Sequence, residues 1–460
     1  MRRTFHLVPV FLLGVTLRTL AGTAIDPSQA REIDAVAQEW LASTQAPSAS
    51  IAVVEGGKLV YARAYGNARL NPAVPATPAM RYAIDSVSKE FTAAAVLMLA
   101  EDKKLSLSDP VGKWFPQLGA ASKATLRQLL THTAGIRDYW PQDYVPAEML
   151  RPTTTAGIID EWAKRPVDFA PGTDWQYSNT GYVLAGAIVE KVAGEPLLQF
   201  LQRRIFSPLG MSRVTQDDSA PLSADDPGAY TRNGLGPIVS APKEGPGWLF
   251  GAAALAMTPS DLARWDISLI ERSLLTPRSY TAEFQPIVLR NGKKRDYALG
   301  LDVETLGGRL RIGHEGAGSG FLAVNRIWPT EKAAVIVLTN NDWASPETLL
   351  DRIAFLILPP SPELARARDL FGQLQRGSID RSLFTANANQ FLDEQVLSQM
   401  RTGLAPLGPA RSIELERESK RGGMVTRRWK IQCRAKALQA VERSYPDGKV
   451  EQFTVSELYD

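Results

Sequence analysis

The sequence contains few of the residues that bind metals or form disulfides. Its 460 residues include three histidines and a single cysteine, Cys433. No intramolecular disulfide can therefore form, and a histidine-rich metal site is excluded. The net charge is only +3, which gives nucleic-acid binding little support. After the N-terminal segment, no run approaches the 18 apolar residues that indicate a membrane-spanning helix.

The first 24 residues are organised like a secretory signal. Arg2 and Arg3 precede an apolar run from Leu7 to Leu17, and small residues follow up to Ala24. This order of basic, apolar and small residues is typical of a cleaved export signal. We therefore expect residues 1–24 to be removed and the mature chain to be exported, either to a periplasm or out of the cell.

The rest of the chain is too long for one core, so at least two domains are expected. Alternating apolar residues predict strands over 50–55 and 58–64, on either side of Gly56-Gly57, and again at intervals over 297–340. Short helical patterns occupy the chain from about 105 to 270. Strands at both ends with helices between them indicate an α+β fold, in which one antiparallel sheet flanked by helices carries an inserted all-helical lobe. A cleft between the sheet and the lobe is the expected place for a site.

A change of pattern divides the chain near Pro359-Pro360-Ser361-Pro362. We expect a main domain over residues 25–358, a linker over 359–362 and a small α+β accessory domain over 363–460. In that domain the sequence predicts helices over 362–374, 378–384 and 387–401, followed by a strand meander. Cys433 alternates with Trp429 and Ile431 on one of these strands, so we expect it in the core.

Ser86 and Lys89 stand at the start of a strongly apolar helical segment that continues to Ala100. At positions i and i+3 their side chains share one face of the helix. A serine hydroxyl becomes a nucleophile only when a nearby base accepts its proton. A lysine can act as that base if burial lowers its pKa from about 10.4 to near 7. A Ser-x-x-Lys pair alone is a weak signal, because chance matches are common.

Two further stretches support the first. Tyr177-Ser178-Asn179 lies between a turn at Gly172 and the next helical segment, and offers a phenol for proton transfer and an amide for hydrogen bonding. His314-Glu315-Gly316 ends a predicted strand, where a glycine lets a substrate lie close to the backbone. Ser88 has no lysine three residues later, so Ser86 is the preferred nucleophile.

These three stretches, in this order, resemble the motifs of the serine β-lactamase and penicillin-binding-protein superfamily. The likeness is greatest to its class C-like branch of esterases, D-aminopeptidases and D,D-peptidases, and covers about residues 33–358. It implies a β-lactamase/transpeptidase-like fold, an acyl-enzyme and no cofactor. It implies that Ser86 is the nucleophile, Lys89 the base and Tyr177 the acid/base. Asn179, His314 and Gly316 would contact the substrate. The backbone N–H groups of Ser86 and Ala317 would be the oxyanion donors.

The third motif departs from the Lys-Thr-Gly of many members of this superfamily. His314 is mostly neutral near pH 7, so it should hold a substrate carboxylate less firmly than a lysine would. This favours esters, amides or peptides with amino-terminal D-residues, including peptidoglycan-derived ones. A β-lactamase or D,D-carboxypeptidase activity stays open, as do a binding or sensing module without turnover and any oligomeric state. Strand alternation predicts that Glu315 points away from His314, toward Arg311, and we expect His132 to be structural.

Overall fold

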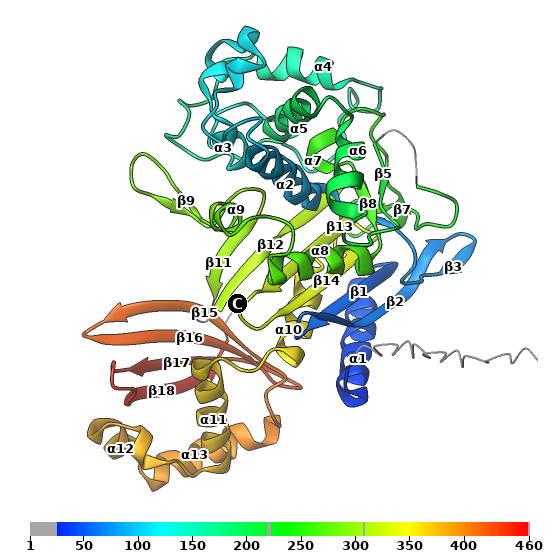
Figure 1. Cartoon of the computed structure of the whole chain (residues 1–460). Coiled ribbons are helices and arrows are strands. Elements are labelled where there is room, and N and C mark those ends of the chain that lie inside the picture. The colour runs from blue at the N-terminus through cyan, green and yellow to red at the C-terminus, as the bar shows by residue number, and fades with distance from the viewer. Residues whose placement is uncertain (1–24, 219–221, 307–308, 459–460) are drawn as a thin grey trace, which may run out of the picture.

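The computed structural model describes residues 25–218, 222–306 and 309–458, so the signal expected at residues 1–24 lies outside the described residues. At its centre is a seven-stranded antiparallel sheet with the order β11-β12-β13-β14-β1-β2-β3 (Figure 1). Its strands are β1 (Ser48–Glu55), β2 (Lys58–Leu70), β3 (Ala73–Pro75), β11 (Asp302–Leu306), β12 (Arg309–Gly318), β13 (Phe321–Trp328) and β14 (Ala333–Thr339). β1 pairs with β14, so the sheet is assembled from distant segments as predicted.

Helices cover both faces of this sheet. α1 (Pro27–Thr44) and α10 (Glu347–Ile357) share one apolar core with the sheet. The other face packs against α8 (Pro259–Glu271) and the helical lobe, in a second and larger core. β14 is buried along its whole length, since helices lie over both of its faces. The mixed α+β fold predicted from the sequence is confirmed.

The helical lobe is built around α2 (Ser88–Glu101) (Figure 1). This helix is apolar on nearly all sides, so it can be stable only inside the lobe. The helices around it are α3 (Leu126–Leu130), α4 (Thr155–Ile158), α5 (Asn179–Ala193), α6 (Leu197–Leu201), α7 (Phe250–Ala253) and α9 (Pro277–Glu283). The connecting segments contain short strands, namely β4 (Tyr82–Ala83), β5 (Thr215–Gln216), β6 (Tyr230–Arg232), β7 (Ile238–Ser240), β8 (Leu255–Met257), β9 (Ile287–Val288) and β10 (Lys294–Arg295).

The C-terminal region has a core of its own, which includes the buried Cys433. Its elements are α11 (Pro362–Arg376), α12 (Ala386–Phe391), α13 (Glu394–Leu404), β15 (Ser412–Arg421), β16 (Met424–Gln432), β17 (Ala437–Ser444) and β18 (Val450–Glu457), and the strands pair in sequence order. The predicted helix over 378–384 is wrong, because only a 3-10 turn forms there. The predicted helix over 387–401 is two helices, since Asp393 caps a new one by accepting from the Val396 N–H at 2.8 Å.

The strand predicted to begin at Tyr297 begins instead at Asp302. Residues 298–301 form a turn in which the Ala298 N–H donates to the Leu301 carbonyl at 2.8 Å. Gly300 has a φ of +76° there, and a Cβ atom on it would lie 2.8 Å from the Lys89 carbonyl oxygen. The turn therefore packs directly against α2, and only glycine fits at this position. None of the helices in the described ranges combines the length and apolarity needed to cross a bilayer.

Candidate active site

Ser86 and Lys89 are brought together by the start of α2. A 3-10 turn at Asp85–Val87 leads into the helix at Ser88, so both side chains lie on one face as predicted. The Lys89 Nζ atom lies 2.8 Å from the Ser86 Oγ atom. The Lys89 side chain has no exposed surface. An amine is thus held within hydrogen-bonding distance of a hydroxyl, away from water.

The surroundings of Lys89 favour its neutral form. Besides Ser86, its Nζ donates to the Asn179 Oδ1 atom at 2.8 Å and to the Ala252 carbonyl at 2.9 Å, and neither partner carries a charge. Burial lowers the pKa of Lys89 to about 7, although the nearby Asp138 and Asp85 act in the opposite direction. A substantial fraction of the amine is therefore unprotonated at pH 7 and can accept a proton from Ser86.

Tyr177 lies next to the same amine. The Lys89 Nζ atom is 4.8 Å from the centroid of the Tyr177 ring. Burial raises the pKa of Tyr177 well above 10, while a hydrogen bond with Ser86 lowers it. Burial outweighs the hydrogen bond with Ser86, so the pKa of Tyr177 stays above its ordinary value. The phenol is therefore protonated near neutral pH and can donate a proton, whereas Lys89 is the better base.

Asn179 is the first residue of α5, and Ser178 caps that helix by accepting from the Gly181 N–H at 3.3 Å. The Asn179 Nδ2 atom donates to the Asp138 Oδ2 atom at 3.2 Å. The same carboxylate accepts the Asn179 backbone N–H at 3.0 Å. These contacts turn the amide oxygen toward Lys89. Sequence reasoning missed Asp138, because no local motif marks a carboxylate that reaches a residue 41 positions later.

Strand β12 packs against the turn that carries Ser86. A Cβ atom on Gly316 would lie 2.1 Å from the Ile84 carbonyl oxygen, and one on Gly318 would lie 2.1 Å from the Asp85 Oδ1 atom. No side chain larger than glycine fits at either position. This close approach brings the backbone of Ala317, between the two glycines, to the turn of the nucleophile, where the resemblance requires an oxyanion donor.

His314 lies on β12 and is buried, with 4% of its surface exposed. Its Nε2 atom lies 3.0 Å from the Tyr297 Oη atom, and its Nδ1 contacts the carbonyl of Glu315. Burial lowers the pKa of His314 to about 3, and the charge of Lys89 acts in the same direction. The imidazole is therefore uncharged near neutral pH. The expected Glu315 contact with Arg311 is wrong, because Glu315 forms an ion pair with Arg326 at 2.6 Å.

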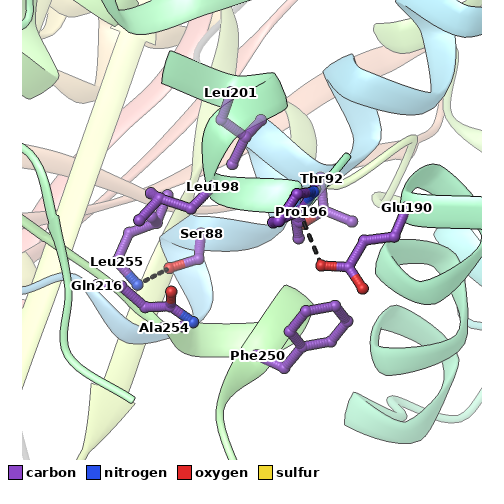
Figure 2. Close-up of a pocket in the computed structure, with 11 residues that line it drawn as sticks. Ser88, Thr92, Glu190, Pro196, Leu198, Leu201, Gln216, Phe250, Ala254 and Leu255 are labelled. Carbon is purple, nitrogen blue, oxygen red and sulfur yellow. Dashed lines mark hydrogen bonds between the residues drawn. The ribbon is translucent and has the colours of Figure 1, made fainter. Parts of the chain in front are cut away.

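A cavity of about 70 Å³ is lined by residues of α2, α6 and α7 (Figure 2), and neither Ser86 nor Lys89 of the site lines it. Helix α7 contributes to both, since Ala252 accepts from Lys89 and Phe250 lines the cavity. Ser88 also lines it, and its hydroxyl accepts from the Leu255 N–H at 3.1 Å. The hydroxyl of Ser88 is therefore engaged away from Lys89, as expected if Ser86 is the nucleophile.

The fold and this constellation together define a serine hydrolase. The chain belongs to the Beta-lactamase family, whose sequence profile matches residues 33–356. It is 27% identical over 307 residues to "Penicillin-binding protein 4*" of Bacillus subtilis, covering 64% of this chain and 68% of that protein. It is 31% identical over 243 residues to "Protein flp" of Staphylococcus aureus, covering 51% of this chain and 48% of the relative. The chain thus spans about half the length of the second relative.

Solved structures share the fold. The octameric penicillin-binding protein homologue from Pyrococcus abyssi superposes with a TM-score of 0.64 at 22% identity, over 94% of this chain and 96% of the other. A D-amino acid amidase from Ochrobactrum anthropi SV3 superposes with a TM-score of 0.64 at 22% identity, over 72% of this chain and 98% of the other. The first likeness includes the C-terminal region, while the second covers less of this chain.

Proposed function

We propose that this chain is an exported, cofactor-free serine hydrolase that forms an acyl-enzyme at Ser86. Its substrates would be uncharged esters, amides, or peptides with amino-terminal D-residues. The observation that carries the proposal is the buried Lys89 amine, 2.8 Å from the Ser86 hydroxyl and bound otherwise only to neutral acceptors. The class C-like motifs and the fold shared with a D-amino acid amidase support the choice of substrates.

The reaction begins when Ser86 attacks a carbonyl carbon while Lys89 accepts the hydroxyl proton. The backbone N–H groups of Ser86 and Ala317 would stabilise the negative charge that develops on the carbonyl oxygen. Loss of one such donor typically costs about 10²–10³ in rate. The protonated phenol of Tyr177 would then donate to the leaving group, and the free Nδ2 hydrogen of Asn179 would hold the substrate. Water enters and releases the acyl group by the reverse sequence of proton transfers.

Covalent labelling tests the nucleophile. A fluorophosphonate probe should label the wild-type protein and the Ser88→Ala variant, but not Ser86→Ala. Ser88→Ala is the matched control, because it removes a hydroxyl two residues away that does not contact Lys89. Equal labelling of the wild type and Ser86→Ala would contradict the assignment.

A substrate panel tests the proposed specificity. p-Nitrophenyl butyrate and D-Ala-p-nitroanilide should be turned over faster than nitrocefin, which carries a carboxylate. Dominant nitrocefin hydrolysis would instead favour the alternative of a β-lactamase or D,D-carboxypeptidase. A stable adduct in intact-protein mass spectrometry, with no product released, would favour a binding or sensing module.

A further inference from the structure

Three buried side chains from three distant segments form a continuous chain of hydrogen bonds beside Tyr177. The His132 Nε2 atom, after α3, lies 3.1 Å from the Tyr297 Oη atom. The same oxygen lies 3.0 Å from the His314 Nε2 atom on β12. All three residues are at least 96% buried. None of the three sequence motifs includes Tyr297, and the proposed reaction assigns it no role.

The two ends of this chain of hydrogen bonds fix the positions of its protons. At one end the Ser178 backbone N–H donates to the His132 Nδ1 atom at 3.1 Å, so that nitrogen carries no proton. At the other end the Glu315 carbonyl can only accept, so His314 carries its proton on Nδ1. His132 must then donate from Nε2 to Tyr297, and Tyr297 must donate to the His314 Nε2 atom. The Tyr182 hydroxyl, which donates to the Leu130 carbonyl at 2.6 Å, is a second possible acceptor for Tyr297, but only this proton order also satisfies the His314 Nε2 atom.

These contacts join the second and third motifs. Ser178, whose N–H begins the chain, directly follows Tyr177 in the sequence. The rings of His132 and Tyr177 lie with their centroids 4.2 Å apart at an interplanar angle of 31°. His314, at the other end, lies on the strand that approaches the Ser86 turn. The position of the phenol is thereby tied to the position of β12.

We propose that His132, Tyr297 and His314, which we call the relay, are positioning residues that hold Tyr177 and β12 in place around Ser86. Their hydrogen bonds have one fixed order of donors and acceptors. Because both ring nitrogens of His314 are engaged inside the protein, this residue presents neither a charge nor a free N–H to a substrate carboxylate. This inference about the substrate rests on the proposed function. It means that the site takes substrates with no carboxylate on the leaving group.

The charged groups around the relay act in the same direction. Lys89 faces both histidines, and Arg326 lies near His314, so a positive charge on either imidazole is opposed. The groups that face Tyr297 are Tyr182, Tyr177 and Asp302. Asp302 lies 3.6 Å from the guanidinium of Arg326, which offsets its charge.

Histidine nitrogen NMR tests the relay directly, since the sequence has only three histidines. In the full-length chain labelled with ¹⁵N-histidine, the signal that disappears in His6→Gln is set aside. His132 should then show the Nε2–H tautomer and His314 the Nδ1–H tautomer, and neither should titrate between pH 5 and 8. The opposite tautomer at His314, or titration of His314 near pH 6.5, would overturn the proposal.

Tyr297→Phe removes the central hydroxyl and should leave His314 without a single preferred tautomer, while the far-UV circular dichroism is unchanged. Tyr82→Phe is the matched control, because Tyr82 is also fully buried and its hydroxyl contacts Ser48 instead. It should leave both tautomers intact. A His314 tautomer that stays fixed in Tyr297→Phe would show that Tyr297 does not order it.

The substrate part is tested with phenyl acetate and 3-acetoxybenzoate, which differ by a carboxylate on the leaving group. Their ratio of kcat/KM cancels the titration of Lys89, which both reactions share. The ratio should favour phenyl acetate and stay within about twofold between pH 6 and 8. A histidine of ordinary pKa would be about 3% protonated at pH 8 and about 76% at pH 6, so a ratio that falls toward pH 6 would overturn it. If neither ester reacts, the proposed function fails, and the NMR result still decides the relay.

Discussion

Replacing Lys89 with methionine should make the protein more stable and inactive. Burial lowers the pKa of Lys89 from 10.5 to about 7, and the unfolded chain regains the ordinary value. A pKa lowered on folding means that the unfolded state binds the proton more tightly. The stability penalty is therefore complete below pH 7 and disappears as the pH rises toward 10.5. At about 1.4 kcal/mol for each pKa unit, this difference amounts to roughly 5 kcal/mol.

The methionine variant also loses favourable contacts. The Ser86 Oγ, Asn179 Oδ1 and Ala252 carbonyl oxygens each lose the donor that Lys89 provides. Each lost hydrogen bond costs roughly 1 kcal/mol. About 2 kcal/mol of net stabilisation remains at pH 6, which corresponds to a rise in Tm of about 3 °C for a domain of this size. The activity should fall by about 10²–10⁴, the usual contribution of a general base.

Calorimetry at pH 6 and pH 9, with p-nitrophenyl butyrate hydrolysis measured in parallel, checks both parts. The gain in Tm should be larger at pH 6 than at pH 9, because the penalty in the wild type shrinks as the pH rises. Lys104→Met is the matched control, since Lys104 is exposed just beyond the same helix, and its Tm should match the wild type. A Lys89→Met variant that melts below the wild type at pH 6, or that keeps its activity, would refute the reasoning.

Four further outcomes are expected. The kcat/KM of the wild type should fall tenfold per pH unit below the pKa of about 7 at Lys89, and a flat profile from pH 5 to 8 would contradict a lysine base. Asp138→Asn should move the acid limb of the pH profile to lower pH, because the carboxylate raises the pKa of Lys89. It should also lower kcat if the Asn179 amide loses its orientation. An acid limb that does not move would exclude the effect of Asp138 on the pKa of Lys89. Burial raises the pKa of Asp266 to about 8, so its protonated form is favoured on folding and stability is lost as the pH rises from about 4 to 8. Asp266→Asn should accordingly raise Tm more at pH 8 than at pH 5, as calorimetry can show. Deleting the residues after Leu358 should leave small-ester turnover nearly unchanged, and complete loss of turnover in a folded truncation would oppose this.

The parts of the fold and site that local sequence predicts are those set by short-range geometry. Ser86 and Lys89 could be paired because helical spacing places i and i+3 on one face. The hairpin at Gly56-Gly57 could be placed because a pair of glycines between two strand patterns favours such a turn, and both glycines adopt a positive φ in the structure, at 57° and 75°. That strands from both ends of the domain form one sheet also followed from where the helical insertion begins and ends. In each case the deciding contact lies within a few residues or follows from the order of elements.

The parts that could not be predicted depend on contacts between distant residues. Asp138 reaches Asn179 across 41 positions, and Tyr297 reaches His132 across 165. Tyr297 looked like the first residue of a strand, because its neighbours alternate in the same way. Only the packing of the Gly300 turn against α2 moves the strand start to Asp302 and leaves the phenol facing the histidines.

Burial gives the site a common electrostatic character. It lowers the pKa of Lys89 to about 7 and that of His314 to about 3, and it raises the pKa of Tyr177. Near neutral pH the groups around Ser86 therefore carry little charge, and no histidine cation is present to meet the negative charge of an oxyanion. In the proposed reaction that charge is met by backbone N–H dipoles, together with the Lys89 ammonium that forms as Ser86 attacks, and both act strongly in a site of low dielectric constant. For these N–H groups to reach the oxyanion, β12 must pack closely on the Ser86 turn. Glycine at position 316 permits this packing, because there is no room for a side chain there.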